Sequence, residues 1–170
     1  MPVTPYHFGP GVAIKATIPR YFSFTIFCLA QVVTDCETAY HMVRGEYPLH
    51  RVLHTYLGAT GVAVFCIVVG RPVCQFLLRR WAEWPDAPFK RYFPVGHAIS
   101  WEAAIAGAFI GAYSHVFLDS IMHPDVRPFS PFSESNPCYL LVGLVTLHLF
   151  CIVSGILGAS YLALHSTAKA

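Results

Sequence analysis

The stretch that decides the fold covers residues 98–122 and reads AISWEAAIAGAFIGAYSHVFLDSIM. Its only histidine or charged residues are Glu102, His115 and Asp119, and the other residues are apolar, aromatic or small. About 20 consecutive apolar residues are enough for a helix to cross the hydrocarbon core of a bilayer. The stretch therefore predicts a membrane-spanning helix with a histidine and an aspartate near its C-terminal end.

Two other stretches share this composition. Residues 52–70 carry His54 as their only histidine or charged residue, and residues 138–164 carry only His148. The whole chain is 55% hydrophobic and 12% charged, with a mean hydropathy of +0.53. A soluble protein needs a charged surface that this composition cannot supply, whereas a bilayer requires none. The sequence therefore predicts an integral membrane protein, and its 170 residues fit a single domain.

The N-terminal part of the chain contains two shorter apolar stretches. Residues 7–18 hold Lys15 and end at Pro19-Arg20, and residues 20–40 form a second stretch that ends in acidic side chains. A proline between two apolar stretches favours a break between two helices. We therefore expect an all-α fold in which a short N-terminal helical hairpin precedes three transmembrane helices. The expected helices cover about residues 7–18, 20–40, 51–79, 98–122 and 138–165 of one domain, residues 1–170.

Lys and Arg residues are distributed unequally between the two sides of this topology. Eight fall on one side, namely Lys15, Arg20, Arg71, Arg79, Arg80, Lys90, Arg91 and Lys169. The other side has only Arg44, Arg51 and Arg127. Because cytoplasmic connections are enriched in Lys and Arg, we expect the N-terminus outside and the C-terminus in the cytoplasm. The aromatic and basic residues over 79–94 predict an amphipathic segment at the cytoplasmic interface.

Most histidines and carboxylates are expected on the opposite, extracytoplasmic side. Six of the nine carboxylates and six of the nine histidines fall there, namely Asp35, Glu37, Glu46, Asp119, Asp125, Glu134, His7, His41, His50, His54, His115 and His123. Charged groups inside a bilayer are costly, so Asp119 within an apolar helix is a candidate functional residue. The alternative is a buried hydrogen bond or ion pair that only holds helices together.

The spacing of these residues favours a shared cation site. His115 and Asp119 stand four residues apart and therefore lie on one helix face, and His50 and His54 repeat this spacing at the start of the expected third helix. A divalent cation would neutralise carboxylates that otherwise repel each other at low dielectric constant. Mixed imidazole and carboxylate ligands suit zinc, and also manganese or ferrous iron. The residues expected to meet are His7, Asp35, His115, Asp119 and one or both of His50 and His54, with His123 beside them.

Four short motifs occur in order along nearly the whole chain. They are MPVTPYH at residues 1–7, VTDCE at 33–37, HRVLHT at 50–55, and SHVFLD at 114–119 followed by HPDVRPF at 123–129. This series resembles the YdjM-like inner-membrane proteins, a bacterial family described as membrane-bound, metal-dependent hydrolases. That family has an N-terminal His, a Pro-Asp-x-Asp, a His-Arg-Gly-x-Thr-His and a His-x3-Asp. The chain differs in having Thr34 and Glu37 for the Pro and the second Asp, and in a His50–His54 interval one residue shorter.

The resemblance implies an integral protein of the bacterial inner membrane with a hydrolytic metal site. Residue by residue, it points to His7, Asp35, Glu37, His50, His54, His115 and Asp119. It favours His54 over His50 as the metal ligand, because Thr55 and the apolar helix after it match the continuation of the family motif. The predicted metal ligands are therefore His7, Asp35, His54, His115 and Asp119.

Two classes of function fit these residues. In the first, a metal-dependent hydrolase at the membrane surface cleaves a lipid ester or phosphodiester, with Glu37 or His50 as general base and Arg127 binding a phosphate or carboxylate. In the second, the protein is a metal-binding or accessory subunit of a membrane complex without turnover. Membrane lipids are expected partners in both cases, as is a second copy or another subunit. The net charge of +2 does not indicate nucleic acid.

Gly107 and Gly111 form a Gly-x3-Gly pattern in the stretch over residues 98–122. Small residues at this spacing allow a neighbouring helix to approach closely. The pattern therefore predicts a tight helix contact one turn away from His115. The six cysteines lack the spacing of metal ligands, which favours small buried hydrophobic side chains.

Overall fold

The computed structural model describes residues 5–83 and 98–167, and every regular element in them is helical. The elements are η1 (Pro5–His7), α1 (Phe8–Thr17), α2 (Phe24–Arg44), α3 (Tyr56–Phe65), η2 (Cys66–Gly70), α4 (Arg71–Glu83), α5 (Trp101–Met122) and α6 (Leu144–Thr167). Three helices are long and apolar enough to cross a membrane, namely Tyr56–Glu83, Trp101–Met122 and Leu144–His165. The first combines α3, the π-helical turn η2 and α4. The expected fold class, an all-α membrane protein with a short N-terminal helix pair and three spans, is confirmed.

Capping side chains set where three of the helices begin. The hydroxyl oxygens of Ser23, Thr55 and Ser100 accept hydrogen bonds from the first-turn N–H groups of α2, α3 and α5, respectively. The cap at Thr55 starts α3 at Tyr56, five residues later than expected, so His50 and His54 lie in a loop instead of on a helix face. Likewise α2 begins at Phe24 and α6 at Leu144, later than the sequence indicated.

The larger hydrophobic core lies between α2, α3 and α5, and glycines bring α5 especially close to α2. A Cβ atom added at Gly111 would stand 2.8 Å from the carbonyl oxygen of Phe27 and 3.0 Å from the Cβ of Ala30. Gly107 likewise faces the backbone of Ser23. The close helix approach predicted from the Gly-x3-Gly pattern is therefore present, and it fixes α5 against α2 just below the level of His115.

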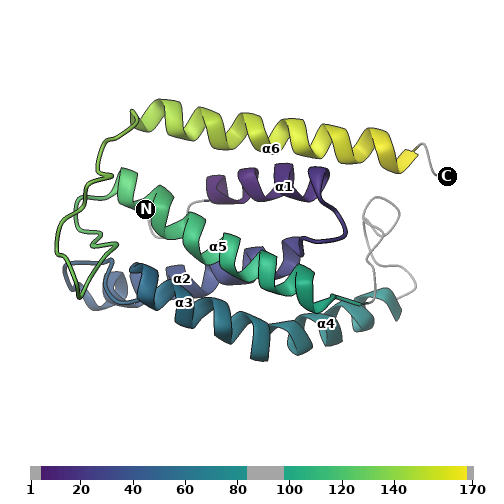
Figure 1. Cartoon of the computed structure of the whole chain (residues 1–170), viewed down its shortest axis with the longest axis horizontal. Coiled ribbons are helices and arrows are strands. Elements are labelled where there is room, and N and C mark those ends of the chain that lie inside the picture. Colours follow the sequence, from purple (N-terminus) through teal and green to yellow (C-terminus); the bar gives the residue numbers. More distant parts are fainter. Residues whose placement is uncertain (1–4, 84–97, 168–170) are drawn as a thin grey trace.

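Helix α6 packs on the rest of the fold mainly through α1 (Figure 1). Glycines make this contact close, since a Cβ atom added at Gly158 would stand 2.7 Å from the backbone of Ala13. Apolar side chains on the remaining surface of α6 are exposed, including Leu149, Ile156 and Leu157. A face of this kind is stable when it contacts lipid.

The two loops over residues 45–55 and 123–143 lie at the same end of the helices (Figure 1). They are joined by a hydrogen bond from the N–H of Leu49 to Oδ2 of Asp125, at 2.9 Å. Helix α1 begins and helices α2 and α5 end at this same end of the bundle. Residues 84–97 lie outside the described part of the chain. They include most of the amphipathic segment expected over residues 79–94, and also His97.

Candidate metal centre

Asp119 is the centre of a buried cluster of ionisable side chains. It lies in the last turn of α5 and is only 2% exposed. Its Oδ1 stands 3.5 Å from Nε2 of His7, and its Oδ2 stands 3.4 Å from Nε2 of His54 and 3.2 Å from Nε2 of His115. Nε2 of His115 is also 3.4 Å from Oδ1 of Asp35. All five residues expected as ligands therefore converge, from η1, α2, the loop before α3, and α5.

Distances within this cluster match those between ligands of one cation. One ligand atom from each of Asp35, His54, His115 and Asp119 lies within 4.8 Å of the others, so this buried group could hold a metal ion. Around a metal with bonds of 2.0–2.1 Å, neighbouring ligand atoms stand about 3.0 Å apart in an octahedron and about 3.4 Å apart in a tetrahedron. The observed separations of 3.2–3.5 Å between the carboxylate oxygens of Asp35 and Asp119 and the histidine nitrogens fall close to this range.

Several polar atoms in the cluster lack a hydrogen-bond partner among the described residues. They are both ring nitrogens of His7, Nε2 of His115 and Oδ1 of Asp119. A buried polar atom without a partner costs about 1–3 kcal/mol, and such atoms rarely gather at one place without a reason. Burial also lowers the pKa of His7 to about 4, so this imidazole is neutral at pH 7 and has a free lone pair. The cluster therefore has nitrogen and oxygen atoms whose lone pairs are available to bind a cation.

Three histidines are oriented by acceptors on their outer sides. Nδ1 of His54 lies 3.1 Å from a carboxylate oxygen of Glu37, and Nδ1 of His115 lies 2.5 Å from the amide oxygen of Gln31. Nδ1 of His50 lies 3.0 Å from Asp125. An Nδ1–H that donates to such an acceptor leaves Nε2 with its lone pair, and here each Nε2 faces Asp119. Metal-binding histidines are held in this way in proteins.

Glu37 holds the loop before α3 in place. Its carboxylate accepts the N–H groups of Arg51 and Leu53, at 3.0 and 3.1 Å, as well as Nδ1 of His54. Burial alone would raise the pKa of Glu37, but these donors lower it below its ordinary value. A carboxylate that is held in its charged form by three donors is a poor proton acceptor. These contacts favour a positioning role for Glu37 over the predicted role of general base.

His50 lies beside the cluster, slightly farther from its centre than His54. Its Nε2 is 3.9 Å from Oδ2 of Asp119, against 3.4 Å for His54. Asp125 accepts the N–H groups of Leu49 and His50 in addition to Nδ1 of His50, which fixes the ring. The geometry agrees with His54 as ligand and leaves His50 available for proton transfer.

His123 stacks on His50, with ring centroids 4.4 Å apart. One ligand atom from each of His50, His123 and Asp125 lies within 4.8 Å of the others, which makes a second group of potential ligands. However, three N–H groups already approach the carboxylate of Asp125. We therefore assign Asp125 to positioning His50.

Gln31 is a site residue that the sequence analysis missed. Its amide oxygen faces His115, and its amide nitrogen donates to the carbonyl oxygen of Gly111 at 3.2 Å. The sequence signal was a polar amide one turn before Asp35 in an apolar stretch, and in the structure this side chain is only 1% exposed. Because Gln31 on α2 contacts both His115 and the backbone of Gly111 on α5, the orientation of His115 depends on the packing of these two helices.

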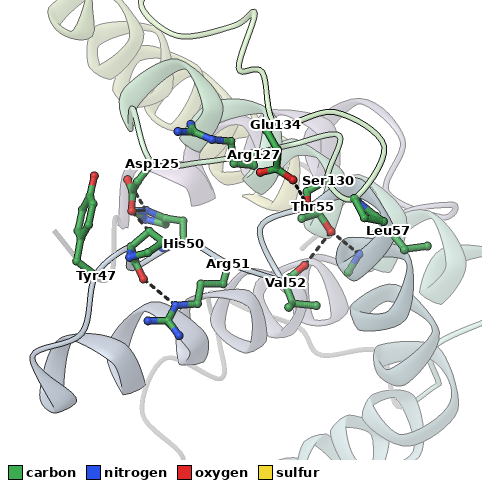
Figure 2. Close-up of a pocket in the computed structure, with 13 residues that line it drawn as sticks. Tyr47, His50, Arg51, Val52, Thr55, Leu57, Asp125, Arg127, Ser130 and Glu134 are labelled. Atoms are coloured by element: carbon green, nitrogen blue, oxygen red, sulfur yellow. Dashed lines mark hydrogen bonds and ion pairs between the residues drawn. The ribbon is translucent and has the colours of Figure 1, made fainter.

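Arg127 lines an open cavity of about 740 Å³ at the same end of the molecule (Figure 2). His50 and Asp125 form part of the wall of this cavity. His50 therefore borders the cavity and also faces Asp119 through Nε2. None of His7, Asp35, His54, His115 and Asp119 lines this cavity, so His50 is the lining residue that also contacts the cluster.

Both histidines of α6 form hydrogen bonds to the backbone of that helix, and the ring of His148 also packs edge-on against Tyr6, the residue before His7. Nδ1 of His148 donates to the carbonyl oxygen of Leu144, and Nδ1 of His165 donates to that of Tyr161, each one turn earlier in the helix. These contacts agree with the structural role expected for both residues.

We compared the chain with protein-family models, with curated proteins and with solved structures, and no significant match was found. The function must therefore be inferred from the site itself.

Proposed function

We propose that this protein is a membrane-embedded hydrolase that depends on a divalent metal ion. The observation that carries the proposal is the convergence of His7, Asp35, His54 and His115 on the buried carboxylate of Asp119. A divalent cation held there would lower the pKa of a water molecule towards neutrality and polarise the bond under attack. Imidazole and carboxylate ligands without thiolates favour zinc, with manganese and ferrous iron as alternatives.

His50 is placed to accept the proton of the attacking water. Its Nε2 faces the cluster, His50 is one of the residues that line the cavity, and Asp125 holds its Nδ1–H. As the water oxygen bonds to the carbonyl carbon or phosphorus, Nε2 takes the proton, and Asp125 stabilises the resulting imidazolium. The same proton then passes to the leaving alkoxide as its bond breaks. Glu37 and Gln31 keep His54 and His115 in orientation throughout.

The substrate we propose is an ester or phosphodiester of a membrane amphiphile. The cavity includes Leu57 in the first turn of α3, which is the start of a membrane span. Arg127, on the opposite loop, supplies a guanidinium group suited to a phosphate or carboxylate. The basic asymmetry of the sequence predicts that this end lies outside the cytoplasm, and we propose the bacterial inner membrane as the location.

One observation favours a second candidate, a metal-binding or accessory subunit without turnover. His54, His115 and Asp119 are at most 2% exposed, so protein encloses the cluster closely. An enzyme needs an open coordination position, whereas a saturated and enclosed site serves storage, sensing or structure. The position of His50 between the cavity and Asp119 favours the enzyme.

Metal content and turnover test the proposal together. Purified protein is expected to bind zinc or manganese and to hydrolyse phospholipid or a chromogenic phosphodiester in detergent. His50→Gln should retain the metal and lose most of the activity, whereas His165→Gln, a control in the last turns of α6, should retain both. Full metal occupancy with no hydrolysis of ester or phosphodiester lipids would favour the non-catalytic subunit.

A further inference from the structure

The cavity beside His50 carries several charges, and most of them are already paired. Nη2 of Arg51 lies 3.3 Å from Oε2 of Glu46, and Asp125 is bound by His50 and by backbone N–H groups. The two that remain are Arg127 and Glu134, which lie on the loop that follows α5 (Figure 2). Within residues 5–83 and 98–167, neither forms an ion pair. The cavity therefore offers one uncompensated cation and one uncompensated anion.

Backbone contacts orient the guanidinium group of Arg127. Its Nη1 donates to the carbonyl oxygens of Pro124 and Val126, at 2.6 and 3.1 Å. A guanidinium group has five N–H donors in a planar fork, and the donors on Nε and Nη2 have no partner in the described part of the chain. A fork of this kind binds two oxygens of a phosphodiester at once.

Glu134 is held by one contact and keeps acceptor capacity. The hydroxyl group of Ser130 donates to its Oε1 at 3.1 Å, and its other oxygen has no partner among the described residues. A carboxylate at the wall of a cavity repels a second anion and attracts an ammonium group. A ligand that carries only negative charge would therefore be attracted by Arg127 but repelled by Glu134.

The remaining lining suits the apolar part of a lipid. Val52 and Leu57 line the cavity and are 67% and 60% exposed, although both are aliphatic. Leu57 belongs to the first turn of a span, so an acyl chain that starts there can continue along α3 in the bilayer. The volume of about 740 Å³ lies within the range of sites that hold small organic molecules.

We propose that this cavity binds a phospholipid whose headgroup joins a phosphodiester to a primary ammonium, as in phosphatidylethanolamine. Arg127 binds the phosphate, Glu134 binds the ammonium, and Val52 and Leu57 contact the start of the acyl chains. This arrangement satisfies both uncompensated charges with a single ligand of no net charge. This inference rests on the proposed function only where it treats the bound lipid as the substrate. Binding of the lipid itself requires no turnover.

Lipid binding to the full-length protein in detergent, followed by native mass spectrometry, tests this proposal. The probes are phosphatidylethanolamine, phosphatidylglycerol and phosphatidylcholine with identical acyl chains. Phosphatidylethanolamine should bind about two- to fivefold more tightly than the other two, as expected for one additional exposed ion pair. Equal affinity for the three lipids would overturn the proposal.

Two variants test the phosphate contact and the ammonium contact of the headgroup separately. Arg127→Gln should weaken phosphatidylethanolamine and phosphatidylglycerol alike, whereas Glu134→Gln should remove the preference between them. Arg80→Gln and Glu83→Gln are matched controls, because these residues form an exposed pair on α4 and do not line the cavity. A preference that survives Glu134→Gln would refute the assigned role of that residue.

Two further measurements test whether the acyl chains contribute to binding and whether the bound lipid is hydrolysed. Soluble glycerophosphoethanolamine should compete far more weakly than the lipid, and competition at equal affinity would overturn a lipid as the occupant. Selective binding without hydrolysis in the presence of zinc or manganese would refute the proposed function and leave this inference standing. Hydrolysis of amphiphiles with no headgroup preference would refute this inference alone.

Discussion

Replacing Asp119 by asparagine tests the cation site at its centre. Four imidazole nitrogens stand 3.2–3.9 Å from the carboxylate oxygens of Asp119. An asparagine side chain at this position would supply no negative charge, and its amide N–H would compete with a cation for the histidine lone pairs. Loss of a residue that only orients a ligand costs about 10–100-fold in metal affinity, so loss of this central ligand should cost at least about 100-fold.

The assay follows metal binding and thermal stability in detergent. At a free metal concentration 100 times the Kd, binding stabilises the native state by about 2.7 kcal/mol. For a chain of this length, 2.7 kcal/mol corresponds to a rise in Tm of roughly 5–10 °C. The Asp119→Asn variant should show almost no rise at the same metal concentration.

Glu102→Gln is the matched control for this experiment. Glu102 lies on the same helix, in its first turn at the other end from the cluster, and is exposed. The control should bind metal like the wild type. Wild-type affinity in Asp119→Asn, with the control also unchanged, would refute the reasoning.

Three other changes test the surroundings of the cluster. Glu37→Gln should lower metal affinity about 10–100-fold by releasing His54, and chelator competition that finds wild-type affinity would contradict this role. Gln31→Leu should weaken metal binding while Gln31→Glu restores it, and equal titration curves for both variants would show that His115 needs no acceptor. Gly111→Ala should destabilise the fold by about 1–3 kcal/mol, because its Cβ would meet the Phe27 carbonyl, and an unchanged Tm would disprove the tight contact.

The spans were predictable from the sequence because bilayer thickness imposes a length and a composition on each helix. His115 and Asp119 were predictable as neighbours for a similar reason, since the helical period alone brings them together. The Gly-x3-Gly contact also follows from a local pattern. Each of these inferences depends on residues within one helix.

Features that depend on contacts between segments were less accessible. His50 and His54 were expected on one helix face, but Thr55 caps α3 and leaves both in a loop, where different carboxylates hold them. Gln31 was missed because a neutral amide gives no charge signal in an apolar helix. The positioning role of Asp125 depends on the loop after α5 reaching the backbone of residues 49 and 50. The orientation of the chain in the membrane stays a prediction from its basic residues.

X-ray absorption spectroscopy of the zinc-loaded protein tests the central claim most directly. Zinc bound by His7, Asp35, His54, His115 and Asp119 should show only nitrogen and oxygen neighbours at about 2.0–2.1 Å, with the outer scattering of several imidazole rings. His115→Ala should reduce the imidazole contribution. A sulfur neighbour at about 2.3 Å, or a shell of oxygen atoms without imidazole, would contradict the account.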